Sequence, residues 1–201
     1  MKCCIALFLT VALLAGCAKT VSTNLATGQG LVAGRQLGRT AVLVWFGFEA
    51  NDAKGKKKIE RVREIVTTRF ARLPGTTLGD ADVLAKALEP LAWRDAGDVE
   101  LLAAARKAGC DSVALVEVAA CGGELSIGLM PLPVWAVTTR FSYRLRLLDV
   151  QSGTLVQSAM RGRQTGGAYT VRGLDALMRD FDADLASVLT FATPQASLET
   201  H

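Results

Sequence analysis

The sequence predicts a single α/β (α+β) domain, in which helices pack on a central mixed β-sheet of about four or five strands. Two apolar runs, Thr40–Phe48 and Asp111–Ala120, are bounded by turn residues and indicate buried strands. In other segments apolar residues repeat every three to four positions, which indicates helices with one buried face. We expect the domain to span residues 40–192, with a loose tail at 193–201.

Residues 1–16 have the layout of a secretory signal peptide. Lys2 precedes the apolar run Ile5–Leu14, and small residues then lead to Cys17. The run is well short of the roughly 20 residues that a transmembrane helix needs, so a membrane span is the weaker alternative. A signal for soluble secretion is a second alternative, but it does not require a cysteine after the small residues.

The segment Leu14-Ala15-Gly16-Cys17 resembles the lipobox of bacterial lipoproteins. The resemblance implies cleavage before Cys17, whose thiol then carries a diacylglyceryl group with acyl chains such as palmitate. Each buried methylene stabilises membrane binding by about 0.8 kcal/mol, so a triacylated Cys17 would hold the protein on a membrane. By the same resemblance, Ala18 implies sorting to the outer membrane. We therefore expect a lipid-anchored protein on the periplasmic face of the outer membrane.

Residues 17–39 are predicted to form a lipid-anchored flexible tether, because they are mostly small or polar and include several glycines. A flexible coil of this length spans about 25 Å. Lys2 is one of the 23 lysines and arginines, so cleavage of the signal leaves 22 of them against 19 acidic residues, a net charge of +3. This charge is too small to predict a nucleic-acid partner.

A basic helix is predicted after the first strand. Asn51 or Asp52 can cap it, Pro74-Gly75 ends it, and its buried face consists of Ile59, Val62, Ile65, Val66, Phe70 and Leu73. Its first turns carry the cations Lys54, Lys56, Lys57, Lys58 and Arg61. Cations are unfavourable at a helix N-terminus, which is an indication of an anionic partner such as phospholipid headgroups or lipopolysaccharide. The alternative is an ordinary solvated helix face.

Shorter elements follow this helix. A short strand is expected at Thr76–Gly79, and a helix at Ala81–Leu88 begins after its cap, Asp80. A second helix is expected at Val99–Ala108 with Asp98 as its cap. Gly109 follows this helix at the position where glycine commonly ends one.

The end of the chain predicts an antiparallel hairpin and a final helix. Apolar and polar residues alternate over Phe141–Leu147, and Thr154–Arg163 returns as the partner strand after a turn at Asp149–Gly153. The final helix, Leu174–Leu189, has the clearest apolar face in the sequence. Three acidic residues are expected opposite that face: Asp180, Asp182 and Asp184.

Glu124–Thr139 is predicted to be a long β-hairpin or loop with an apolar tip at Leu129–Trp135. Pro131 and Pro133 exclude a strand in the centre of a sheet there. An exposed apolar tip of this kind would bind a partner or a membrane, whereas the alternative is a tip that folds back on the core. The candidate partner-binding residues are Leu129, Met130, Leu132 and Trp135.

The residues do not predict an enzyme, a metal site or a cofactor. His201 is the only histidine and lies at the end of the chain, so neither a Ser-His-Asp nor a Cys-His arrangement is expected. Cys110 and Cys121 are separated by a predicted strand of about 30 Å, too far for a disulfide. They are expected to be buried free thiols.

Glu117 is the acidic residue that needs an explanation. It lies in a predicted buried strand, where a carboxylate must be paired or have a raised pKa. Arg144 or Arg146 on the neighbouring strand is its expected partner. We interpret such a pair as structural rather than catalytic.

Two segments, Ala108–Val118 and Tyr143–Leu155, resemble segments of a bacterial envelope lipoprotein superfamily. This superfamily includes the curli secretion channel subunit CsgG, the penicillin-binding-protein activator LpoB and the amino-terminal domain of TolB. The resemblance covers Thr40–Arg163 and implies the α/β fold of the superfamily rather than an activity. The chain departs from the pattern at Cys110, where the superfamily usually has alanine, and at Glu117, near its glycine.

The resemblance implies a protein-binding role in the cell envelope. A pore like that of CsgG needs two transmembrane hairpins, for which Glu124–Thr139 is too short. The tether at residues 17–39 is too short to reach across the periplasm as that of LpoB does. We therefore expect a non-catalytic adaptor or assembly factor that binds another envelope protein. The alternative is a ring-forming secretion or transport component, which would be a homo-oligomer.

Overall fold

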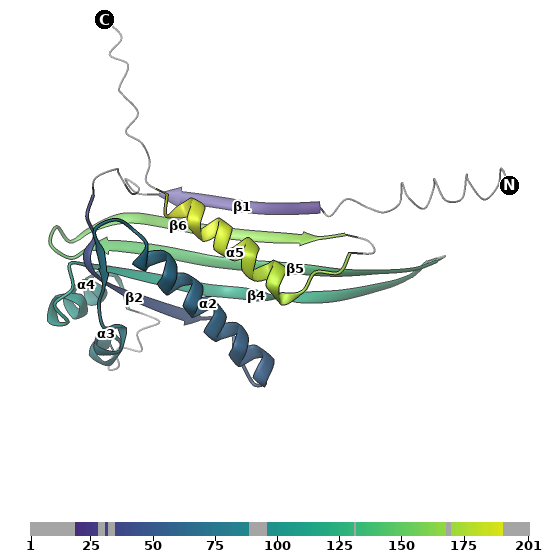
Figure 1. Cartoon of the computed structure of the whole chain (residues 1–201), viewed down its shortest axis with the longest axis horizontal. Helices are drawn as coiled ribbons and strands as arrows, with labels where there is room; N and C mark the ends of the chain where they lie inside the picture. Colours follow the sequence, from purple (N-terminus) through teal and green to yellow (C-terminus); the bar gives the residue numbers. More distant parts are fainter. Residues whose placement is uncertain are drawn as a thin grey trace, which may run out of the picture.

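The structure is a computed structural model that describes residues 19–27, 31, 35–88, 96–130, 132–167 and 170–190. Within them lies one six-stranded mixed sheet with the order β1-β6-β5-β4-β2-β3 (Figure 1). Its strands are β1 (Lys19–Thr27), β2 (Gly38–Phe46), β3 (Thr76–Leu78), β4 (Ser112–Met130), β5 (Leu132–Asp149) and β6 (Thr154–Gly166). The helices are α2 (Ala53–Ala71), α3 (Ala81–Leu88), α4 (Asp98–Lys107) and α5 (Leu174–Val188). The predicted α/β class is confirmed, with six strands instead of four or five.

Helices cover both sides of the sheet. Side chains of a strand alternate between the two sides, so Ala114 and Val116 of β4 pack with α2 and α5, while Val113 and Leu115 pack with α3 and α4. β2 is buried from both sides in the same way, which is why its sequence is a continuous apolar run. The two runs predicted as buried strands are therefore neighbouring parallel strands of this sheet.

α2 is the amphipathic helix that the sequence predicts. Val62, Val66 and Phe70 on its apolar face are completely buried. The carboxylate of Asp52 accepts a hydrogen bond of 2.6 Å from the backbone N–H of Gly55, which confirms Asp52 as the N-cap.

The predicted flexible tether is wrong for Lys19–Thr27. These residues form β1, which pairs antiparallel with β6 from Lys19 opposite Gly166 to Thr27 opposite Ser158. The segment contains β-branched residues, which fit a strand, and β6 offers it a row of backbone groups to pair with. Small polar residues occur in both coils and edge strands, so composition did not separate the two.

The cap role predicted for Asp98 is wrong. The N-cap of α4 is Gly97, not Asp98, because the carboxylate of Asp98 instead accepts a hydrogen bond of 2.9 Å from Arg146. The three acidic residues predicted opposite the apolar face of α5 each bind a donor outside the helix. The pairs are Asp180 with Arg172, Asp182 with Arg69 and Asp184 with Tyr143.

Candidate interaction site

The hairpin of β4 and β5 projects beyond the rest of the sheet (Figure 1). β2 pairs with β4 only as far as Val118, and β6 pairs with β5 only from Thr139 onward. Past these points the described residues of the two strands pair as a two-stranded ribbon. One further hydrogen bond of 3.0 Å joins the ribbon to the chain before α5, from the N–H of Val137 to the carbonyl of Thr170. The predicted long hairpin is confirmed.

One side of this ribbon carries exposed apolar residues. Leu125 lies opposite Val137 and Ile127 lies opposite Trp135, so the side chains form two adjacent cross-strand pairs. Leu125 is 60% exposed, Ile127 65% and Trp135 38%. We call the four residues of these two pairs, Leu125, Val137, Ile127 and Trp135, the hairpin ladder.

The predicted apolar tip is described only in part. Trp135 belongs to the hairpin ladder and is partly exposed. The backbone of the other three predicted partner-binding residues lies in β4 and β5, but their side chains lie outside the description: Leu129, Met130 and Leu132. Sequence analysis did not assign Leu125, Ile127 and Val137 to the site, although the alternation of apolar residues on either side of the prolines was the signal for them.

The hairpin ladder lies on the side of the sheet that α2 and α5 cover. Cys121 opposite Phe141 belongs to the core beneath these helices, and steps of two residues lead from this pair to Leu125 and Val137. The other side of the ribbon carries polar or small residues, namely Glu124, Ser126, Ala136 and Thr138. The apolar side of the ribbon is thus an extension of the core surface past the helices.

α2 and α5 both begin beside the base of the ribbon. In α2, the ammonium group of Lys58 donates to the carbonyl of Cys121 at 2.8 Å and lies 5.4 Å from the centre of the Phe48 ring. Just before α5, the guanidinium of Arg172 donates to the hydroxyl of Thr139 at 3.1 Å. The positive ends of both helix dipoles therefore lie at this end of the molecule.

Two residues of the predicted basic cluster have partners within the chain. Lys58 is half-buried against the ribbon, and Arg61 forms an ion pair of 2.8 Å with Glu64. Lys54, Lys56 and Lys57 are exposed. Arg61 is exposed as well, and Lys54 and Lys57 are the exposed members that lie beside the base of the ribbon.

A groove of about 390 Å³ lies between α2, the start of α5 and the base of the ribbon. It is lined by four cations, Lys54, Lys57, Lys58 and Arg172, together with glycines and apolar residues. Arg172 forms an ion pair with Asp180 behind it. The lining includes no acidic residue, so the groove favours anionic groups. Sequence analysis missed Arg172, because it is distant in sequence from the lysines.

The predicted lipidation site is close in sequence to this end of the sheet. Cys17 and the lipobox residues before it lie outside the described residues. Only Ala18 separates Cys17 from Lys19, which pairs with Gly166 at the end of β6. Gly166 in turn lies against Thr138 of the ribbon, closely enough that a Cβ on Gly166 would collide with it. The described chain therefore begins at the base of the ribbon.

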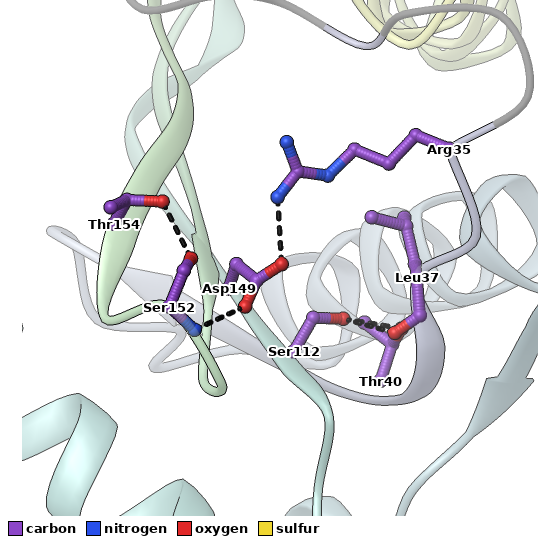
Figure 2. A network of polar contacts seen from close by, with 7 residues as sticks. All are labelled: Arg35, Leu37, Thr40, Ser112, Asp149, Ser152 and Thr154. Carbon is purple, nitrogen blue, oxygen red and sulfur yellow. Dashed lines mark hydrogen bonds and ion pairs between the residues drawn. The ribbon is translucent and has the colours of Figure 1, made fainter.

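The opposite end of the sheet is closed by polar contacts (Figure 2). The carboxylate of Asp149 accepts hydrogen bonds from Arg35 at 2.7 Å and from the N–H of Ser152 at 2.9 Å. Burial of Asp149 opposes its ionisation, but these hydrogen bonds outweigh it and hold the pKa of the carboxyl below its ordinary value. Beside them, the hydroxyl of Ser112 donates to the carbonyl of Leu37 at 2.9 Å.

Glu117 has the partner that the sequence led us to expect. Arg146 lies 3.2 Å from Glu117 and 2.9 Å from Asp98, so one guanidinium serves two carboxylates. The Arg146 side chain is only 11% exposed. This cluster lies on the α3 and α4 side of the sheet, away from the hairpin ladder.

Cys110 and Cys121 are free and buried, as predicted. Burial raises the pKa of the Cys121 thiol to about 11 and also raises that of Cys110.

In the described parts of the chain, no three side chains of the metal-binding types come together. None of the described helices has the length and apolar character to span a membrane.

Comparison with known proteins yields similarity to solved structures only, since no protein-family model and no curated protein matches the chain. The PelC dodecamer from Paraburkholderia phytofirmans is 21% identical with a TM-score of 0.45, covering 86% of this chain and 100% of that one. A lipoprotein from Neisseria meningitidis is 16% identical with a TM-score of 0.44, covering 75% and 97%.

LpoB, which the sequence resemblance names, is also among the similar structures. Its C-terminal domain from Salmonella enterica is 14% identical with a TM-score of 0.37, covering 65% of this chain and 86% of that one. Identities and scores at this level assign the chain to no family. The functional argument therefore depends on the residues of this chain.

Proposed function

We propose that this protein is an outer-membrane lipoprotein, anchored through Cys17 on the periplasmic side, that acts as a non-catalytic adaptor by binding another envelope protein. The observation that carries the proposal is the hairpin ladder. A two-stranded ribbon with exposed apolar residues on one side is an unusual element in an isolated soluble domain, because such surface is normally buried. Its apolar side is therefore a surface for a partner.

The chemistry beside the hairpin ladder indicates what the partner must carry. Lys54, Lys57 and Arg172 line the groove at its base, and both helix N-termini lie there. A partner with an apolar patch bordered by acidic groups would complement this surface, gaining burial from the ladder and favourable charge pairing at the rim. The basic cluster and the apolar hairpin would then act as one binding surface.

The anchor supports the same assignment. Lipidation at Cys17 would place the membrane two residues before β1, whose first residue pairs at the base of the ribbon. A partner bound to the hairpin ladder would thus be held close to the membrane. An adaptor needs two attachment points of this kind, and it needs no catalytic groups.

Photo-crosslinking in living cells tests the proposal. A photoreactive amino acid is placed at Ile127, in the hairpin ladder, and in a matched variant at the neighbouring Ser126, which is also exposed but on the other side of the ribbon. We expect Ile127 to capture one envelope protein that Ser126 does not capture. Binding of that protein in purified form should be lost in Ile127→Ser and weakened in Lys57→Glu.

Other outcomes contradict the proposal. Crosslinks from Ile127 to other copies of the chain would favour the ring-forming alternative. Equal capture from both positions, or none from Ile127, would show that the hairpin ladder is not the surface that binds a protein. A Cys17→Ser variant that still sediments with membranes would contradict the lipid anchor separately.

A further inference from the structure

β1 is a strand with one unused edge. Along its inner edge it pairs with β6 from Lys19 to Thr27, and it is the last strand on that side of the sheet. No described residue pairs with its outer edge. Every side chain from Thr20 to Thr27 is exposed, including Val21 at 55% and Leu25 at 60%. Contacts of these side chains with the core therefore add little to the backbone pairing that holds β1.

The outer edge of β1 lacks the features by which proteins protect an edge strand. Such strands usually carry charges, prolines or bulges, or are very short. β3, at the other edge of the sheet, has three residues. β1 has nine, with no charge or proline after Lys19 and no break in its register with β6. It therefore presents a regular row of N–H and C=O groups.

We propose that two copies of this protein pair antiparallel through their β1 strands, about a two-fold axis at Thr23. This register uses the full length of the strand and is self-complementary, as a two-fold interface requires. It places Val21 opposite the partner subunit's Leu25, and Leu25 opposite the partner subunit's Val21. Lys19 lies opposite the partner subunit's Thr27, so no like charges meet.

Apolar surface beside β1 supports this occupant. Leu25 pairs with Met160 of β6, which is 50% exposed on the same side of the sheet. In the dimer, Met160, Leu25 and the partner subunit's Val21 form a continuous apolar row across three strands, and the two-fold axis repeats it. Cross-strand apolar pairs of this kind stabilise antiparallel sheets.

The dimer surface is separate from the hairpin ladder. Met160 lies opposite Arg144 of β5, which lies opposite Glu117 of β4, and Glu117 belongs to the α3 and α4 side. The apolar row is therefore on the side of the sheet opposite to the ladder. Both surfaces can be occupied together, so the dimer goes beyond the adaptor function and does not depend on it.

Disulfide trapping in cells that make the full-length protein tests this register. At the two-fold axis a Thr23→Cys substitution would bring two thiols together with the Cα atoms within the about 4.4–6.8 Å that a disulfide needs. The matched control is Thr27→Cys, on the same strand and equally exposed, where the register separates the two residues by about 27 Å. We expect a dimer on a non-reducing gel after mild oxidation for Thr23→Cys only.

Mixed cysteines fix the register further. Co-expressed Val21→Cys and Leu25→Cys chains should form a mixed disulfide, whereas each alone places its thiols about 14 Å apart and should not. The native thiols Cys110 and Cys121 are buried and do not interfere.

Several outcomes would overturn the proposal. Equal trapping at positions 23 and 27 would mean random collision. A Thr23→Cys thiol that a soluble reagent modifies, without dimer formation, would mean that the edge is free. A thiol that is neither modified nor trapped would mean that another segment or protein covers the edge.

Discussion

At one end of the sheet the central strands are covered on both sides, by α2 and α5 on one and by α3 and α4 on the other. At the other end β4 and β5 continue as a bare ribbon with the hairpin ladder on one side. The same two strands form both regions, so the difference lies in what surrounds them. The covered region accounts for stability, and the ribbon contributes little to it. We interpret the ribbon as a region maintained for binding, and the following predictions test this contrast.

The largest expected effect is in the covered region. Phe181 of α5 is completely buried, with its ring centre 5.7 Å from that of Phe141 and 5.3 Å from that of Tyr143. Phe181→Ala should lower the free energy of unfolding by about 3–5 kcal/mol, because it leaves a cavity among aromatic rings. Denaturant unfolding of the purified protein measures this, and a loss below 1 kcal/mol would mean that α5 is not firmly packed on the sheet.

The second largest loss of stability is expected when the charge cluster on the α3 and α4 side of the sheet is disrupted. Arg146→Met leaves Glu117 and Asp98 without their shared cation, and should lower the free energy of unfolding by about 2–3 kcal/mol. The double variant with Glu117→Leu should recover part of this loss. If the double variant is no more stable than the single one, unpaired charge is not the cause.

A smaller effect is expected where α2 and α5 meet. Hydrogen bonding to Arg69 lowers the pKa of the Asp182 carboxyl below its unfolded value. The resulting stability is present above the unfolded pKa and is lost as the pH falls through the folded pKa. Water partly screens the pair, so the effect should stay below about 1 kcal/mol. From pH 6 to pH 3, the free energy of unfolding should decline less steeply for Asp182→Asn than for the unsubstituted protein. Equal slopes for the two proteins would contradict the assignment.

The smallest effect on stability is expected in the hairpin ladder. Ile127→Ser should change the free energy of unfolding by no more than about 0.5 kcal/mol, because the side chain is already exposed. The same substitution is expected to abolish binding of the partner. A loss of 2 kcal/mol or more would instead place the ladder within the core and remove the contrast.

Sequence reasoning succeeded where local pattern and tertiary packing agree. The apolar runs of β2 and β4 and the helix Ala81–Leu88 were found, and the Asp80 carboxylate accepts from the N–H groups of Asp82 and Val83 as its cap role requires. It failed for β1, where polar residues form a strand only because β6 is adjacent.

The candidate site was partly predictable for a related reason. The basic cluster and the apolar hairpin were each visible as local composition. The position of the lysines beside the hairpin depends on contacts between residues that are distant in sequence, such as Lys58 and Cys121. Arg172 joins the groove through Thr139 in the same way, and no local pattern reveals it.

The irregularity in β4 between Val118 and Ala120 determines which residues of the ribbon face the helices. Val118 faces them, and unbroken alternation of the same residues would put the even-numbered positions there, including Glu124 and Ser126. The inserted residue, Ala119, moves Leu125 and Ile127 there instead. Deletion of this one alanine would therefore remove the irregularity and leave the hairpin ladder on its present side, because Ala120, Cys121 and the ladder residues would then follow Val118 in regular alternation. In the history of such a chain, a single codon could be lost or gained at this position without turning a partner's contact surface away.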